Sequence, residues 1–77
     1  MMSTKFAVGD LVQVRDEAIV VTDEEAGARA KAKFTVIESF DHLDGSYGVT
    51  FFNENAEPIR STVGFPMFFY FPYELEK

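Results

Sequence analysis

The sequence contains no cysteine among its 77 residues. Disulfides, thiolate nucleophiles and cysteine zinc sites are therefore excluded, and a reducing, cytoplasmic compartment is the simplest expectation. Positive charge is also scarce, because seven lysine and arginine residues face 13 aspartate and glutamate residues and leave a net charge of −6. A protein of that sign does not follow phosphate groups unaided, so nucleic acid is disfavoured as a partner.

Long apolar runs are missing as well. The longest one is far shorter than the ~20 residues that a membrane-spanning helix needs, and residues 1–5 lead into no apolar signal region. We therefore expect no membrane association and no targeting segment. At 77 residues the chain should form a single domain, 1–77. The small core of such a domain would gain stability from self-association or from a partner.

Alternation of apolar and polar residues predicts short strands. Val12 and Val14 alternate with polar neighbours and indicate a strand at about 11–15. Segment 18–22 is either a continuation of it after a bulge or a separate strand. Similar patterns predict four further strands, at 34–40, 47–52, 59–63 and 67–71. The Asp-Gly pair at 44–45 predicts an antiparallel hairpin between the first two of these.

The segment at about 22–33 is polar and rich in alanine. Its acids precede its bases, which suits a helix dipole. However, Gly27 costs about 1 kcal/mol relative to alanine, and the alanines offer no large apolar face. We therefore expect a long polar loop with at most one or two helical turns. The predicted fold is all-β, a five-stranded small barrel rather than a sandwich.

Several segments together resemble a known family of small barrels. Val-Gly-Asp at 8–10 enters the Leu-Val-Gln-Val-Arg strand, and a long loop follows. Tyr-Gly-Val-Thr-Phe and a closing aromatic strand then lead into Pro-Tyr-Glu-Leu-Glu. This order is similar to SH3-like small barrels, which include the KOW type and many short proteins of bacteria and their phages. The resemblance implies a platform that binds protein or RNA rather than an enzyme, and the size suits a phage origin.

Aromatic residues concentrate near the end of the chain. Six of the twelve (nine Phe and three Tyr) lie within the nine positions 65–73. Because successive side chains of a strand point to opposite faces, one barrel interior cannot receive them all. We expect Phe69 and Phe71 to face inward, since they belong to the longer apolar row. Phe68 and Tyr70 are then expected to face outward.

Outward aromatic rings are typical of an interface. We expect Phe68 and Tyr70, with Phe52, to contact a second copy of the chain or another protein. The alternative is that the barrel bends, or that the 23–33 segment covers the outer rings.

Acidic residues cluster twice without an intervening lysine or arginine, at 16–25 and at 38–57. One interpretation is a solvated surface that keeps an aromatic-rich domain soluble. The other is an acidic face, with Glu24 and Glu25 as contact residues, that docks on a basic groove of a partner. An inhibitor of a nucleic-acid-binding protein would act in this way.

The bases at 29–33 form the only basic cluster. Charge balance on a solvated surface explains them. Alternatively, Arg29, Lys31, Arg60 and Tyr47 build a small-ligand or nucleotide site at an oligomer interface, with the tyrosine as a stacking platform.

Residues for catalysis or metal binding are sparse. His42 lies between Asp41 and Asp44 but lacks the spaced His and Cys ligands of zinc sites. Calcium-loop spacing, a nucleophile motif and a glycine-rich phosphate loop are also absent. The sequence therefore predicts no metal, no cofactor and no enzyme. It predicts a protein-interaction or inhibitory module, with small-ligand binding as the alternative.

Overall fold

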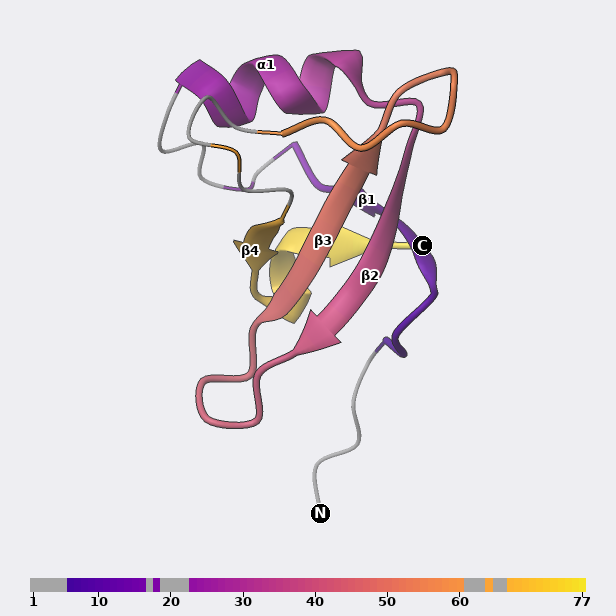
Figure 1. Ribbon diagram of the computed structural model, residues 1–77. Helices are drawn as coiled ribbons and strands as arrows, with labels where there is room; N and C mark the ends of the chain where they lie inside the picture. Colours follow the sequence, from indigo (N-terminus) through magenta and orange to yellow (C-terminus); the bar gives the residue numbers. More distant parts are fainter. Residues whose placement is uncertain (1–5, 17, 19–22, 61–63, 65–66) are drawn as a thin grey trace.

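The structure is a computed structural model that describes residues 6–16, 18, 23–60, 64 and 67–77 (Figure 1). Its five strands are β1 (Leu11–Val14), β2 (Phe34–Phe40), β3 (Tyr47–Phe52), β4 (Phe68–Tyr70) and β5 (Leu75–Glu76). Helix α1 (Asp23–Lys31) lies between β1 and β2, and the 3₁₀ turn η1 (Pro72–Glu74) lies between β4 and β5. The fold is thus mostly strand with one short helix, as the sequence predicts. In the described part of the chain, no helix has the length and apolarity needed to cross a membrane.

The strands form one antiparallel sheet in the order β4-β3-β2-β1-β5. The predicted hairpin joins β2 to β3. Asp41 and Ser46 close it with a backbone hydrogen bond of 2.9 Å from the Asp41 N–H to the Ser46 carbonyl. Gly45 has φ +78°, a conformation that glycine adopts without steric cost. The Asp-Gly signal therefore located the turn correctly.

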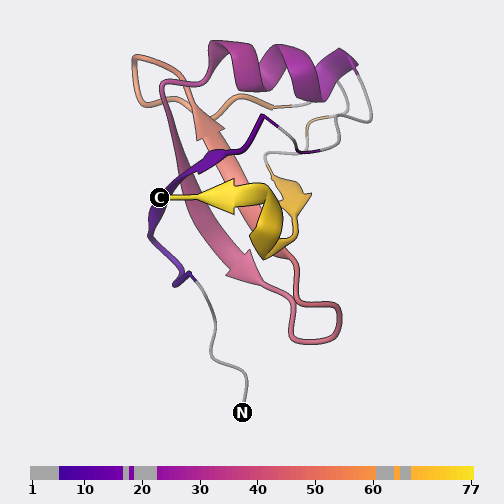
Figure 2. The same cartoon turned by 180° about the vertical axis from the view of Figure 1, so that it is seen from behind.

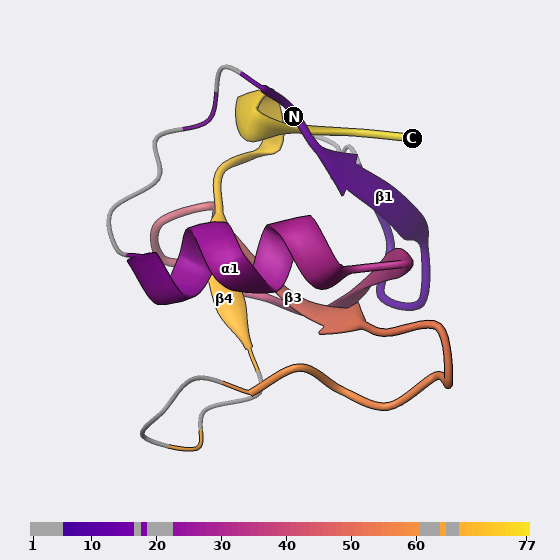
Figure 3. The same ribbon diagram turned by 90° about the horizontal axis from the view of Figure 1, so that it is seen from above.

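The sheet curls back on itself. A flat sheet of five strands would separate its two edge strands by about 19 Å. Here β4 and β5 are the edges, yet only residues 71–74 connect them, and a 3₁₀ turn such as η1 advances only ~2 Å per residue. Figure 2 shows η1 and β5 lying across the β2–β3 pair, and Figure 3 shows α1 over one end of the curled sheet. Among the described residues, no pairing joins β4 to β5.

Ten buried hydrophobic side chains fill the space that this curl encloses. They are Phe6, Val12, Ala18, Ala28, Ile37, Tyr47, Val49, Phe51, Tyr70 and Leu75. Helix α1 contributes only Ala28 to this set. The segment expected to be a polar loop with at most one or two helical turns holds one short helix, of nine residues. Its acid-first charge order and helix-favouring alanines outweigh the cost of Gly27.

The strand predicted at 59–63 is not found at its described positions. Pro58 makes one isolated bridge with Phe52, and the Ile59 N–H donates to the Phe51 carbonyl at 2.8 Å. Residues 61–63, and most of the uncertain 18–22 segment, lie outside the described residues. The fifth strand is instead β5, which pairs with β1 and buries Leu75 completely.

The orientation predicted for β4 is wrong. Tyr70 pairs with Tyr47, and the side chains of directly paired residues lie on the same face of a sheet. Because Tyr47 is in the core, Tyr70 is too, with 2% of its surface exposed. Phe69 therefore points outward and is 62% exposed, and Phe71 is 38% exposed.

Gly48 explains why the longer apolar row faces outward. It pairs with Phe69 across the β3–β4 ladder and has no side chain on the outer face. A Cβ atom at this position would collide first with Oγ of Ser39, its partner in β2, and would lie 3.1 Å from Cε1 of Phe69 and 3.3 Å from Sδ of Met67. The side chains of Phe69 and Met67 therefore pack over the glycine, on the outside of the sheet.

A candidate acidic and aromatic binding groove

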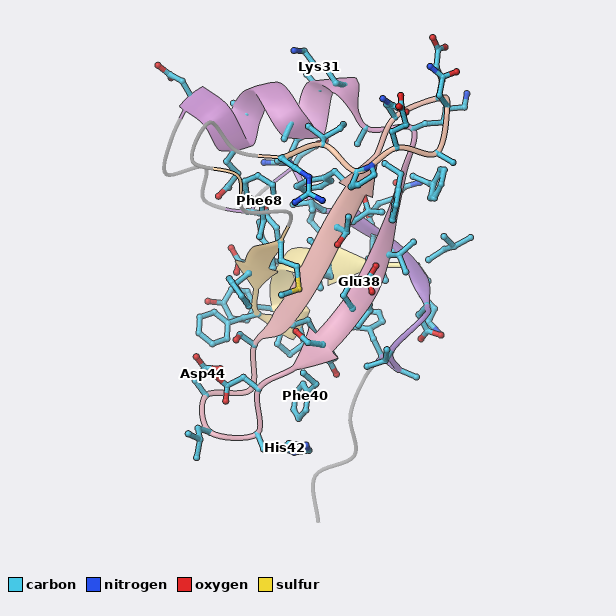
Figure 4. The ribbon with its side chains drawn as sticks, viewed as in Figure 1. Lys31, Glu38, Phe40, His42, Asp44 and Phe68 are labelled. Carbon is cyan, nitrogen blue, oxygen red and sulfur yellow. The ribbon has the colours of Figure 1, made fainter. Side chains whose placement is uncertain are left out.

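A groove of about 420 Å³ lies between the β2–β3 loop and the aromatic segment that contains β4. It is lined by Asp41, Asp44, Ser46, Phe69, Tyr70, Phe71 and Glu74. The pairing of Tyr47 with Tyr70 places the loop before β3 beside the residues around the end of β4. In Figure 4, Asp44 lies on the side of the loop nearer β4, whereas Phe40 and His42 lie on its other side. We name this site the acidic groove.

Three carboxylates line the acidic groove, and each is held by its own backbone. Asp41 Oδ1 accepts the N–H of the residue two positions later at 2.7 Å. Asp44 Oδ1 accepts the N–H two positions later at 2.8 Å, and Glu74 Oε1 accepts the N–H three positions earlier at 2.9 Å. The negative charges are therefore fixed in place before any ligand arrives, which lowers the entropic cost of binding.

The ionised form of Asp44 is favoured by the hydrogen bonds that its carboxylate accepts. The hydroxyl and the backbone N–H of Ser46 hydrogen-bond to its carboxylate and lower the pKa of Asp44 below its ordinary value. None of the described residues that line the groove is a lysine or an arginine. The groove therefore presents three negative charges that no basic side chain in its lining offsets.

Exposed aromatic rings stand beside these charges. Phe71 stacks on Tyr73, with ring centroids 5.8 Å apart and an interplanar angle of 10°. Tyr73 is 72% exposed, and Phe69 lies on the outer face of β4. The faces of aromatic rings carry negative partial charge and attract cations. Rings and carboxylates in this groove thus favour the same kind of ligand.

The histidine and the carboxylates of the loop between β2 and β3 are arranged differently with respect to the groove. His42, the single histidine of the chain, packs edge-on against Phe40 with ring centroids 4.9 Å apart and does not line the groove. No group of three or more His, Asp or Glu residues in the described part of the chain could hold a metal ion.

The aromatic contact residues predicted from the sequence lie mostly elsewhere. Tyr70 reaches the groove but is buried, which corrects its predicted role as an exposed contact. Phe68 is half-buried and packs on Phe51, with ring centroids 5.2 Å apart. Phe52 is half-buried and stacks on Phe34 at 5.0 Å, away from the groove.

The acidic contact residues predicted from the sequence belong to α1. Glu25 is half-buried and lies near the Tyr70 hydroxyl. Burial of the ring and then the negative charge of Glu25 raise the pKa of Tyr70. Glu25 therefore faces the protein interior rather than a partner. Glu24 is in the same helix, but its side chain lies outside the described residues.

The residues of the predicted small-ligand site do not converge. Tyr47 is 1% exposed, so it cannot stack on a base, and its hydroxyl accepts the Phe6 N–H at 3.1 Å. Arg60 donates to the Gly64 carbonyl at 3.2 Å. Lys31 is exposed on α1. Of these four residues, only Arg29 lines a groove, and that groove lies under α1 and is separate from the acidic groove.

Sequence reasoning missed Phe69, Phe71 and Glu74 as contact residues. It did identify the cluster containing Asp41 and Asp44, but it had no means of pairing that cluster with the aromatic segment. Gly48 is a usable signal, because glycine inside a strand often marks close approach of another group.

No protein-family model, curated protein or solved structure matches this chain. The functional inference therefore depends on the geometry and charge of the groove.

Proposed function

We propose that this protein is a non-enzymatic binding module that holds a basic side chain of a protein partner in the acidic groove. The observation that carries the proposal is the convergence of three carboxylates and exposed aromatic rings in a groove whose described lining contains no base. The resemblance of the sequence to SH3-like barrels, which mostly recognise other molecules, supports the same class of function.

Arginine fits this site better than lysine. Its planar guanidinium can stack on an aromatic face such as that of Phe69 or Phe71 while donating to carboxylates at its edge. Hydrogen bonds between ionised groups are about twice as strong as neutral ones. A lysine ammonium satisfies the charge but not the stacking.

The charge of the whole chain supports a basic partner. A net charge of −6 accelerates encounter with a positively charged surface and repels nucleic acid. An inhibitory adaptor that covers a basic groove of another protein is the specific form that this charge favours. The absence of cysteine from the sequence favours a reducing, cytoplasmic compartment.

A titration of the isotope-labelled protein with a short arginine peptide tests the proposal. Acetyl-Gly-Arg-Gly-amide should shift backbone amide signals at 41–46 and 69–74, and the matching Gly-Glu-Gly peptide should not. The lysine peptide should bind more weakly than the arginine peptide. Equal shifts with the arginine and glutamate peptides, or shifts spread over the whole chain, would contradict a cation site in this groove.

Matched variants separate this groove from the rest of the acidic surface. Asp41→Asn with Asp44→Asn keeps the turn acceptors and removes two charges, and Glu54→Gln with Glu57→Gln removes two charges elsewhere. Phe69→Ser and Leu11→Ser remove apolar side chains of equal exposure, 62% each. We expect only the first member of each pair to weaken arginine binding. Equal weakening by both members of a pair would mean that the general charge or hydrophobicity of the surface, and not the acidic groove, determines binding. Association of the protein with itself, lost in Phe69→Ser, would identify a second copy as the occupant instead.

A further inference from the structure

A second groove, of about 490 Å³, lies between α1 and the β1–β2 part of the sheet. It is lined by Val12, Gln13, Val14, Asp16, Ala26, Arg29, Ala30, Ala32, Lys33, Phe34, Thr35 and Phe51. We name it the helix groove. It shares no residue with the acidic groove, and Lys31 and Asp44 mark the two opposite ends of the molecule in Figure 4.

The helix groove exists because α1 and the residue after it are rich in alanine. Ala26, Ala30 and Ala32 line its helical side, and their single methyl groups leave space above the sheet. Larger apolar side chains at these positions would fill that space, as they do where helices normally pack on sheets. The open space of the helix groove thus follows from the alanines in this part of the sequence.

The floor of the helix groove reaches the core. Val12, Thr35 and Phe51 line it and are all buried. Phe34 also contributes to the lining, but its ring stacks on Phe52 on the other face of the sheet, with ring centroids 5.0 Å apart and an interplanar angle of 13°. The volume of the groove is in the range of small-molecule sites, and its lining combines seven apolar residues with five polar or charged ones.

Two bases and one acid supply the charge of the helix groove. Arg29 is half-buried, and its guanidinium donates to the Arg15 carbonyl at 3.1 Å, which fixes its position. The backbone N–H of Lys33 donates to the Phe52 carbonyl at 2.7 Å and anchors the chain where it leaves the helix. Among the described residues of the lining, Asp16 is the single acid. This described lining therefore carries a net charge of +1, two bases less one acid, on a protein whose total is −6.

We propose that the helix groove binds a small organic monoanion with an apolar body. Lys33 and Arg29 receive the anionic group, and the apolar body lies on Val12 and Phe51 between the sheet and the alanines of α1. A single surplus positive charge suits one carboxylate or sulfonate, whereas a nucleoside triphosphate would bring several uncompensated charges into an acidic protein. The described residues of the site belong to one chain, and none of them lines the acidic groove.

Anilinonaphthalenesulfonate is a suitable probe, because it combines a flat apolar body with one permanent negative charge. We expect saturable one-to-one binding by fluorescence, and amide shifts confined to the helix groove. Phenylnaphthylamine, which lacks the sulfonate, is the neutral control. Lys33→Gln should weaken the sulfonate about fivefold, a loss typical of one partly exposed charge contact, and leave the neutral compound unchanged. Lys31→Gln makes the same charge change outside the lining and should alter neither.

Filling the groove is the second arm of the test. Ala30→Leu should reduce binding of both compounds at least about tenfold, because the added side chain occupies the space of the ligand. Lys31→Leu places the same side chain on the same helix outside the lining and should have no effect. Circular dichroism checks that all variants keep the wild-type fold. Undiminished binding in Ala30→Leu, equal losses in Lys31→Gln and Lys33→Gln, or no saturable binding by the wild type would each overturn the proposal.

Discussion

The two grooves differ in what they rest on. The acidic groove is built from the β2–β3 loop and the outer side of an edge strand, and two of its aromatic rings, Phe69 and Phe71, are exposed. The helix groove rests on the core itself, because Phe51 and its buried neighbours form its floor. The difference teaches that the two sites are constrained differently. The acidic groove can change its contact residues without unfolding the domain, whereas the helix groove can change only on its alanine side.

Replacing one aromatic residue in each groove by alanine should reveal this difference in the free energy of unfolding. This is the largest effect that we predict. Phe51 is 1% exposed, so Phe51→Ala should lower the free energy of unfolding by about 3–5 kcal/mol. Phe69→Ala should cost less than about 1 kcal/mol, because most of its ring is already in water. Urea denaturation of the two variants measures both values. Equal losses would mean that Phe69 is as enclosed as the core and that the acidic groove is not an open surface.

Two glycine substitutions should move stability in opposite directions. In Gly48→Ala the new Cβ would lie 3.1 Å from the Phe69 ring, so neighbours must shift at a cost of about 1–3 kcal/mol. Gly27 is in α1 with nothing within 4 Å of an added Cβ, so Gly27→Ala should stabilise the domain by about 0.5–1 kcal/mol. Gly48→Ala should also weaken arginine binding, since Phe69 is a wall of the acidic groove. Thermal unfolding, combined with the peptide titration, distinguishes these outcomes. A neutral Gly48→Ala variant would show that Phe69 does not depend on this glycine.

The sequence predicted best the elements whose patterns are local. Strands 34–40 and 47–52 were predicted with the bounds that the structure has, and Asp-Gly located their turn, because alternation and turn chemistry depend on adjacent residues. The strand at 75–76 was missed. A strand of two residues is too short to show an alternation of apolar and polar side chains. β5 is a strand because it pairs with β1.

Orientation and sites depend on register, which adjacent residues do not encode. The face on which Phe69 lies follows from the pairing of its neighbour Tyr70 with Tyr47, a contact across 23 positions, 70 less 47. The same pairing brings Asp41 and Asp44 to the aromatic segment. The acids and the aromatics were therefore both recognised in the sequence, and their meeting was not predicted.

Salt should separate the charge contribution of the acidic groove from its aromatic contribution. At low ionic strength, Asp41→Asn with Asp44→Asn should weaken the arginine peptide about fivefold, and the difference should shrink as salt screens exposed charges. Phe69→Ser should instead weaken binding by a factor that salt hardly changes. Titrations at two salt concentrations provide the measurement. A salt-independent loss in the double variant would mean that Asp41 and Asp44 act through loop structure rather than charge.

Lowering the pH should distinguish ligand binding at the two grooves, and this is the smallest effect that we predict. In the folded protein, hydrogen bonds from the Ser46 hydroxyl and backbone N–H hold the pKa of Asp44 below its ordinary value of 3.8. A carboxyl group of this kind contributes stability and charge above its unfolded pKa, and both are lost as the pH falls through the folded value. The contribution of Asp44 to arginine-peptide affinity should therefore be lost only as the pH falls below the ordinary value of 3.8. Ser46→Ala removes the hydroxyl but keeps the backbone donor, so the decline should begin at higher pH. Sulfonate binding in the helix groove should not decline over the same interval near pH 4, because lysine, arginine and sulfonate all keep their charges there. A parallel decline at both grooves would indicate general unfolding in acid, and an unshifted decline in Ser46→Ala would show that Asp44 does not control the charge of the acidic groove.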